Sequence, residues 1–314
     1  MKRLIYLLLA LPLFAACSNE EFDAMERGQE VQVTVTTEVP VANTRAVIDS
    51  TQIDEVVCGV FENDVEIEGL RTVVPVPADG VLTFTPTLIN GHTYTIVLWA
   101  HTNGSFNVGD NVGDLTAITR VAGKDQALYD VFTTAHTFTV NGSADINVTL
   151  SRPFAQLNIG VSEADWNAVT DSATFNLVPK KVNLTIDNAA TTYNALTGKS
   201  VDAAQTIEYS IPVPADQTIT AGGVNYKLLS QCYVLLEQGF PNADVTYEIL
   251  ADGDKYVTSG KFSSVPFDAN HRTNILGRLM TGEIEYSITL NLVGFNTSEN
   301  PDKNYDPNNP TPNP

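Results

Sequence analysis

The chain has 314 residues, 43% of them hydrophobic and 17% charged, so it can bury a core and is long enough for about two domains. It carries 37 acidic and 17 basic residues, a formal net charge of −20 at pH 7. Such a chain repels nucleic acid and anionic membrane surfaces, and we expect neither as a partner.

The N-terminus has the order of a secretory signal peptide: Lys2 and Arg3, an apolar run, then small residues. The apolar run is too short to cross a membrane as a helix, which takes about 20 residues. The stretch Phe14–Cys17 resembles the lipobox of bacterial lipoproteins, in which cleavage precedes an acylated cysteine. The resemblance implies a signal peptide at 1–16 and a lipidated Cys17. An ordinary signal peptide with a chance cysteine is the alternative.

Residues 17–29 are expected to form a polar, lipidated tether between the membrane and the folded part. The acidic stretch 18–23 resembles the surface-export signal of Bacteroidetes lipoproteins. A merely solvated tether explains so short a charge run equally well.

Residues 30–152 are predicted to form a first domain of β-strands. Valines alternate with polar residues over Val31–Val39, which indicates a half-buried strand, and the segment Val41–Ala46 beyond Pro40 is expected to be an exposed loop. A loop rich in Gly and Asn, Asn103–Asp114, is also expected to be exposed, and Lys124–Phe132 to be a short helix. Further strands are predicted at Glu55–Phe61, Arg71–Val76, Val81–Thr85, Thr93–Ala100, Leu115–Val121, Thr137–Val140 and Ile146–Leu150.

Pro153 interrupts the β pattern, because proline is excluded from the interior of a sheet, and we place a domain boundary there. If this joint is exposed, proteolysis should cut near Ser151–Phe154. The second domain, 153–295, is predicted to start with a strand and a helix in which Ser162 and Asp165 form a capping box. Its strands are predicted at Ala155–Val161, Phe175–Ile186, Gln205–Ile211, Tyr226–Glu237, Val245–Leu250, Lys255–Phe262 and Glu283–Leu292.

Many short strands separated by turns predict an all-β protein made of two β-sandwiches with minor short helices. The composition changes after Phe295, and the Pro- and Asn-rich residues 296–314 are expected to form a disordered or extended tail. Cys58 and Cys232 lie in apolar runs and are predicted to be free core thiols, because the cysteine count excludes a disulfide framework.

Signals for catalysis, cofactors and metals are missing from the sequence. The four histidines lack partners at metal-ligand spacing, and neither a nucleophile elbow nor a phosphate-binding glycine loop occurs. The acidic loop Asp110–Asp114 offers oxygen atoms to calcium but lacks the closing glutamate of an EF-hand. We therefore expect no catalytic, cofactor-binding or metal-binding residues, and a protein that is not an enzyme.

Aromatic residues raise the possibility of sugar binding, since Trp99, Phe106, Tyr129 and Trp166 could stack on sugar rings. Trp99 lies in a strand with little alternation and is expected in the core. Phe106 stands among glycines and is expected to be more exposed than the others, although core packing is the simpler expectation for each.

Three stretches carry a family resemblance: Arg152–Gly160, Val97–Ala100 and Asn270–Gly277. With the lipobox, they resemble the fimbrillin-like surface lipoproteins of Bacteroidales, which are related to type V pilins and include a branch with a domain of unknown function. The resemblance implies two transthyretin-like or immunoglobulin-like sandwiches in tandem. It also implies a pilus-building or adhesive role at the outer membrane surface.

In polymerising members of that family, a protease cuts after an arginine in the loop that follows the first strand. The groove that this opens accepts a strand from the next subunit. Arg45 and Ala46 stand where the cut would fall, which makes them the candidate processing site. One departure is the last β-like run, Glu283–Phe295, which its own domain could require instead of donating it.

Two functions follow as hypotheses. The first is a non-enzymatic cell-surface lipoprotein of fimbrillin-like type, a pilus component or adhesin, held in the outer membrane by its lipid anchor. Its partners would be other pilin subunits, or host or glycan ligands. The alternative is a glycan-binding surface lipoprotein that serves polysaccharide uptake.

Overall fold

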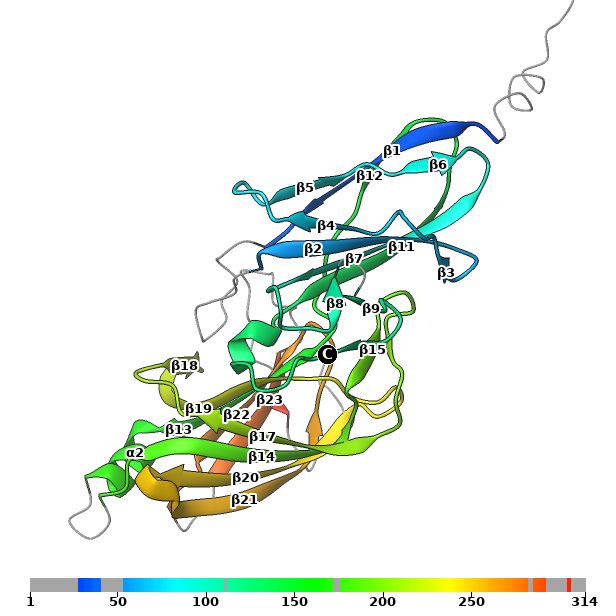
Figure 1. Ribbon diagram of the computed structural model, residues 1–314. Coiled ribbons are helices and arrows are strands. Elements are labelled where there is room, and N and C mark those ends of the chain that lie inside the picture. Colours follow the sequence, from blue (N-terminus) through cyan, green and yellow to red (C-terminus); the bar gives the residue numbers. More distant parts are fainter. Residues whose placement is uncertain are drawn as a thin grey trace, which may run out of the picture.

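The computed structural model describes residues 28–40, 53–109, 112–171, 176–281, 285–291 and 304–305. The chain is all-β, as predicted, and forms two sandwich-like halves stacked end to end (Figure 1). The first half lies at the top of Figure 1 and the second half below it, and a small sheet lies between them.

The first sandwich encloses a core of aliphatic side chains between two sheets. One sheet has the order β12-β1-β5, and β6 also pairs with β1; the facing sheet has the order β11-β7-β2-β3, and β4 also pairs with β2. The alternation that predicted the first strand is correct, because Val33 and Val35 are buried between the sheets. The strands are β1 (Glu30–Glu38), β2 (Glu55–Glu62), β3 (Val65–Glu66), β4 (Thr72–Pro75), β5 (Val81–Phe84), β6 (Thr87–Ile89), β7 (Thr93–His101), β11 (Phe132–Thr139) and β12 (Ala144–Asn147).

The second sandwich has a sheet of order β18-β19-β13-β22-β23-β24 and a facing sheet of order β17-β14-β20-β21. Its core is larger and includes one stacked aromatic pair, Tyr247 and Phe262, with ring centroids 4.9 Å apart. The elements are β13 (Ala155–Ser162), α2 (Glu163–Thr170), β14 (Pro179–Ala189), β17 (Gln205–Pro212), β18 (Thr218–Ala221), β19 (Val224–Val234), β20 (Asn242–Ala251), η2 (Asp252–Asp254), β21 (Lys255–Pro266), β22 (Arg272–Arg278), β23 (Glu285–Asn291) and β24 (Asn304–Tyr305).

The two sandwiches share one pairing scheme that the sequence did not reveal. In the first, β1 is parallel to the last strand, β12, and antiparallel to β5 and β6. In the second, β13 is parallel to β22 and antiparallel to β19. Strand β2 pairs with β4 and β7, as β14 pairs with β17 and β20. The second sandwich adds β23 beside β22, whereas no strand of the described chain takes the matching place beside β12.

The halves are joined by short elements that pack between them. Strand β10, from the first half, pairs with β15 from the second, and β15 pairs with β16. The predicted helix over Lys124–Phe132 is shorter than expected and is a 3-10 turn, because Phe132 already begins β11. These elements are β8 (Val108–Gly109), β9 (Val112–Gly113), β10 (Ile118–Thr119), η1 (Gln126–Tyr129), β15 (Thr192–Asn194) and β16 (Lys199–Ser200).

The predicted capping box at the start of α2 is only half correct. The Ser162 hydroxyl accepts a hydrogen bond from the Asp165 amide, as an N-cap should. The Asp165 carboxylate does not reach back to Ser162, however. It is buried and accepts from the backbone amides of Leu279, Met280 and Thr281, and so fixes the turn after β22.

Candidate functional site

The residues that the sequence singled out for lipidation and processing, Cys17, Arg45 and Ala46, lie outside the described residues, as does the signal peptide. Within the described ranges, no helix is both long and apolar enough to span a membrane. The same part of the chain contains no group of three or more His, Cys, Asp or Glu side chains placed to hold a metal ion.

Strand β1 is the element that the processing hypothesis concerns, and it is an internal strand of its sheet. It runs between β12 on one side and β5 and β6 on the other. Val33 and Val35 are 0% and 1% exposed, so the strand also supplies part of the core. The segment that contains Arg45 begins directly after Pro40, at the end of this strand.

The three stretches that carry the family resemblance meet where the halves join. Arg152 and Asp130 form a buried ion pair, with Nε 2.6 Å from Oδ1 and Nη2 2.8 Å from Oδ2. The Arg152 guanidinium also lies 4.2 Å from the ring centre of Phe132. Next to it, β13 and β22 pair in parallel, and the side-chain amide of Asn158 donates to Asn274 over 2.8 Å. Two of the motifs therefore mark buried polar packing at the junction, and the third, Val97–Ala100, supplies buried apolar side chains such as Trp99.

The aromatic residues considered for sugar stacking are mostly buried in this junction. Trp99, Phe106 and Tyr129 are 0%, 3% and 4% exposed, and the Trp99 and Phe106 ring centres are 5.2 Å apart. The expectation that Phe106 is exposed was wrong, because Phe106 packs against rings from both halves. The expectation that its loop is exposed holds only in part: Asn103, Gly104 and Asn107 are exposed, whereas Ser105 and Val108 are buried. Trp166 is half-buried, with the Lys227 ammonium 5.1 Å from its ring centre.

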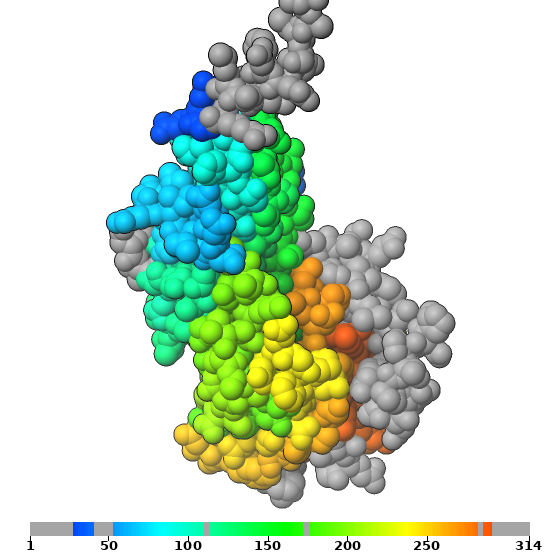
Figure 2. Space-filling view, turned by 90° about the vertical axis from the view of Figure 1, so that its right-hand side faces the viewer, coloured from blue at the N-terminus to red at the C-terminus, as the bar shows by residue number. Residues whose placement is uncertain are grey.

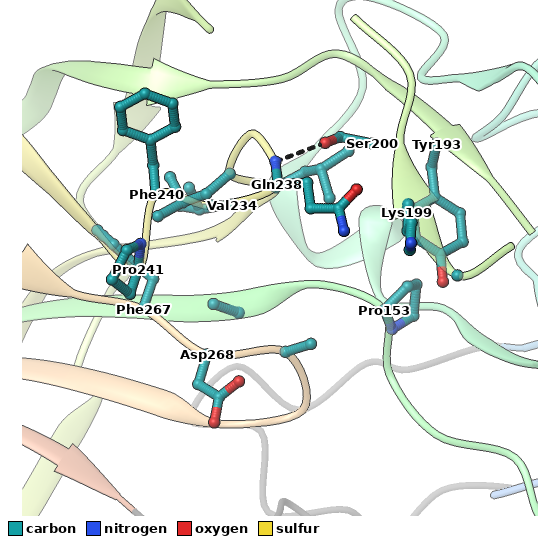
Figure 3. Close-up of a pocket in the computed structure, with 16 residues that line it drawn as sticks. Pro153, Tyr193, Lys199, Ser200, Val234, Gln238, Phe240, Pro241, Phe267 and Asp268 are labelled. Carbon is teal, nitrogen blue, oxygen red and sulfur yellow. Dashed lines mark hydrogen bonds between the residues drawn. The ribbon is translucent and has the colours of Figure 1, made fainter. Parts of the chain in front are cut away.

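A cavity of about 470 Å³ opens in the second half, beside the junction (Figure 3). Four segments of the chain line it: Pro153 and Ala155 at the start of β13, the hairpin that contains β15 and β16, the loop 234–241, and the loop 267–269. The hairpin and the first loop are joined by a hydrogen bond from the Gln238 amide to the Ser200 hydroxyl, 2.9 Å long. We call this cavity the seam pocket.

The seam pocket has a polar side and an apolar side (Figure 3). Tyr193 and Lys199 come from the hairpin and lie together at one end, whereas Phe240 and Pro241 lie at the other. Phe240 is 44% exposed, although its neighbours Val234 and Phe267 belong to the core of the second sandwich. Figure 2 shows the yellow-green hairpin and the yellow loop adjoining on one face of the molecule.

The chain was compared with known proteins. The family described as "Family of unknown function (DUF6562)" matches residues 25–309. The chain belongs to this family. No curated protein matches it.

This DUF6562 protein is similar to several solved structures at low identity. A putative cell adhesion protein from Bacteroides uniformis is 12% identical, with a TM-score of 0.49, and the match covers 83% of this chain and 96% of that one. Putative polysaccharide binding proteins (DUF1812) from Bacteroides thetaiotaomicron are 13% identical, with a TM-score of 0.48, and the match covers 83% of this chain and 96% of that one. A fimbrial assembly protein from Parabacteroides distasonis is 14% identical, with a TM-score of 0.43, and the match covers 88% of this chain and 98% of that one.

Sequence reasoning missed the seam pocket of this DUF6562 protein. Each contributing segment is ordinary by itself: a Gly-Lys-Ser turn, a Gln-Gly-Phe-Pro loop and a Phe-Asp-Ala loop. The one local signal is Gly239-Phe240-Pro241, in which a large aromatic residue stands in a turn where no core position is expected.

Proposed function

We propose that this protein is a non-enzymatic cell-surface lipoprotein that acts as a pilus component or adhesin. The observation that carries the proposal is the place of β1. It is an internal strand close to the chain start, and the predicted processing segment follows it directly. A cut after Arg45 would leave β1 attached to its sandwich only by hydrogen bonds and side-chain packing.

Loss of β1 would open a gap one strand wide between β12 and β5. The backbone groups of β12 and β5 that face β1 would lose their hydrogen-bond partners, and the space in the core that Val33 and Val35 fill would open to water. Such a gap is a template for an extended segment of another chain, which adds backbone hydrogen bonds and fills the pockets with alternate side chains. Strand replacement of this kind supports the pilus form of the proposal.

The source of the incoming strand limits how the protein could assemble. Strand β23 pairs along its whole length with β22, from Arg272↔Asn291 to Arg278↔Glu285, so the second sandwich uses it. A donated segment would have to come from residues beyond 291 or from another protein. The adhesin form, in which this chain accepts a strand but donates none, fits that restriction.

The anchor is tested by metabolic labelling of cells with a fatty acid. The protein should incorporate the label and stay with membranes, and Cys17→Ser should abolish both, because acyl chains provide the attachment. Equal label on both proteins would reject the lipoprotein part of the proposal.

Strand release is tested with an Arg-specific protease on the purified protein, followed by mass spectrometry and size measurement. We expect cleavage after Arg45, loss of the peptide that contains β1, and binding of a second chain. Arg45→Lys keeps the charge but should block this cut, and a Lys-specific protease should restore it. Cleavage that leaves β1 in place and the protein monomeric would contradict strand replacement.

A further inference from the structure

The polar side of the seam pocket holds the hydroxyl group of Tyr193. Tyr193 is 6% exposed, and its ring is fixed by Trp99 and Phe154, with ring centres 5.6 and 5.9 Å away. Its hydroxyl lines the pocket and makes no hydrogen bond to any described residue (Figure 3). Burial raises the pKa of Tyr193 to about 12, so the hydroxyl stays protonated and remains a hydrogen-bond donor.

The opposite side of the pocket is apolar. The Phe240 ring is largely open, and Pro241 and the buried Phe267 continue the apolar wall inward. An open aromatic ring beside a concave apolar wall costs free energy in water unless a ligand covers it. The pocket therefore has an apolar wall at the Phe240 end and a hydrogen-bonding group at the Tyr193 end.

The charges around the pocket restrict the ligand further. Lys199 and Asp268 are the charged side chains that line it, one of each sign, in a chain of net charge −20. Neither sign dominates, so nothing in the lining favours a strongly anionic or cationic ligand. The volume of about 470 Å³ lies in the range of small-molecule sites.

We infer that the seam pocket binds a neutral saccharide, with a C–H face of the sugar ring on Phe240 and hydroxyl groups toward Tyr193 and Gln238. A pyranose ring has an apolar face and a polar edge, which matches the two sides of the pocket. An apolar side chain of a partner protein would fill the wall but would leave the Tyr193 hydroxyl unpaired and buried, which is unfavourable.

This inference is independent of strand release. Among the described residues that line the pocket, none belongs to β1, so the two proposals can fail separately. It gives the surface protein a ligand class, and it gives the alternative glycan-binding function a site.

The test measures binding of the purified, uncleaved protein to neutral oligosaccharides of glucose, galactose, mannose and N-acetylglucosamine, by glycan array and then by calorimetry. Tyr193→Phe removes one hydroxyl and keeps the ring, and we expect affinity to fall about tenfold. Phe240→Ala removes the exposed wall and should weaken binding at least as much. Tyr256→Ala, at a residue 58% exposed on β21, is the matched control and should bind like the wild type.

Thermal unfolding of each variant shows whether a loss of binding reflects a loss of folding. Phe240 is exposed, so its variant should unfold at the wild-type temperature and report on binding alone. The inference is overturned if no neutral oligosaccharide binds, if only charged saccharides bind, or if Tyr193→Phe and Phe240→Ala bind as tightly as the wild type.

Discussion

Arg152 and Asp130 show how a single buried pair holds the junction. Their side chains are each 1% exposed, so both charges are removed from water and each depends on the other. Arg152 also covers the Phe132 ring, which ties the segment before β13 to strand β11. A buried charge without its partner is far more costly than an exposed one.

Arg152→Met should therefore lower the free energy of unfolding by about 3–5 kcal/mol, because it leaves the buried Asp130 carboxylate without the cation that balances its charge. The double change Arg152→Met with Asp130→Leu should cost less than the single one. Lys181→Ala, which breaks the exposed pair with Asp254, is the control and should cost about 0–1 kcal/mol. Guanidinium unfolding of a soluble form that starts after Cys17 measures all three, and equal costs for Arg152→Met and Lys181→Ala would contradict the argument.

The two described cysteines are free and buried, as the sequence predicted. Burial raises the pKa of Cys58 and of Cys232 from 9.0 to about 12. In the unfolded chain these thiols ionise near their ordinary value, whereas in the folded protein they stay neutral. Their contribution to stability is therefore complete below pH 9 and is lost as the pH rises toward 12.

We expect urea unfolding midpoints to fall steadily above pH 9 and the fall to be smaller in the double variant Cys58→Ala with Cys232→Ala. In the native soluble form, a thiol reagent should react with neither cysteine until denaturant is added. Rapid reaction without denaturant, or an identical alkaline loss in the double variant, would show that these thiols are not protected by the fold.

At the scale of elements, β12 and β22 hold matching places in the two sandwiches but differ in how many neighbouring strands they pair with. The Val148 amide donates a hydrogen bond to the backbone carbonyl of Thr36 on β1. Successive backbone amides of a strand point to opposite sides, so the amides of Asp145 and Asn147 point away from β1. No strand of the described chain pairs with that edge. Strand β22, in contrast, has β13 on one side and β23 on the other.

Amide hydrogen exchange should therefore differ between these two strands. We expect rapid exchange at Asp145 and Asn147 and slow exchange at Ile146, which faces β1, and at Thr273 and Asn274 in β22. Exchange measured by NMR resolves these positions. Equal protection of Asp145 and Ile146 would mean that something covers the outer edge of β12.

Most strands could be predicted from the sequence because the alternation of apolar and polar residues that marks a strand lies within the strand's own residues. Val31–Val39 and Glu55–Phe61 became β1 and β2 almost to the residue. Strand β22 was missed, because Arg272 and Asn274 suggest a polar loop, whereas the junction buries Asn274 and half-buries Arg272. Phe106 was misplaced for the same reason: its glycine-rich surroundings predict exposure, and only the folded chain brings Trp99 and Phe154 against it. The seam pocket is assembled from segments that are far apart in the sequence, and Phe240 in its turn is the one local signal for it.

At the scale of the whole molecule, the two halves share a core. The aromatic cluster at the junction takes Trp99 from the first half and Phe154, Tyr193 and Tyr233 from the second. Arg152 and Phe154 are 2% and 3% exposed, so the predicted joint near Ser151–Phe154 is not the open linker on which the proteolysis expectation depended. Separating the halves would expose these rings to water.

We therefore expect the soluble form to unfold in a single transition, in which the fluorescence of Trp99 and Trp166 and the far-UV circular dichroism change together. Limited proteolysis should give no early fragments that meet at Ser151–Phe154. Phe154→Ala should weaken the coupling and separate the two signals, whereas Phe240→Ala, outside the aromatic cluster, should not. Two transitions in the wild type would show that the halves behave as independent domains.

The repeated pairing scheme has a consequence for the geometry of assembly. Strand β13 holds in the second sandwich the place that β1 holds in the first, but the chain continues from both of its ends, through buried Phe154 and into α2. If β1 is released as proposed, the molecule has one replaceable strand in its first sandwich and one permanent strand in its second. Each subunit would then have one gap that can accept a strand from another chain. Subunits joined by strand insertion into this gap would form an unbranched, head-to-tail chain with a fixed polarity.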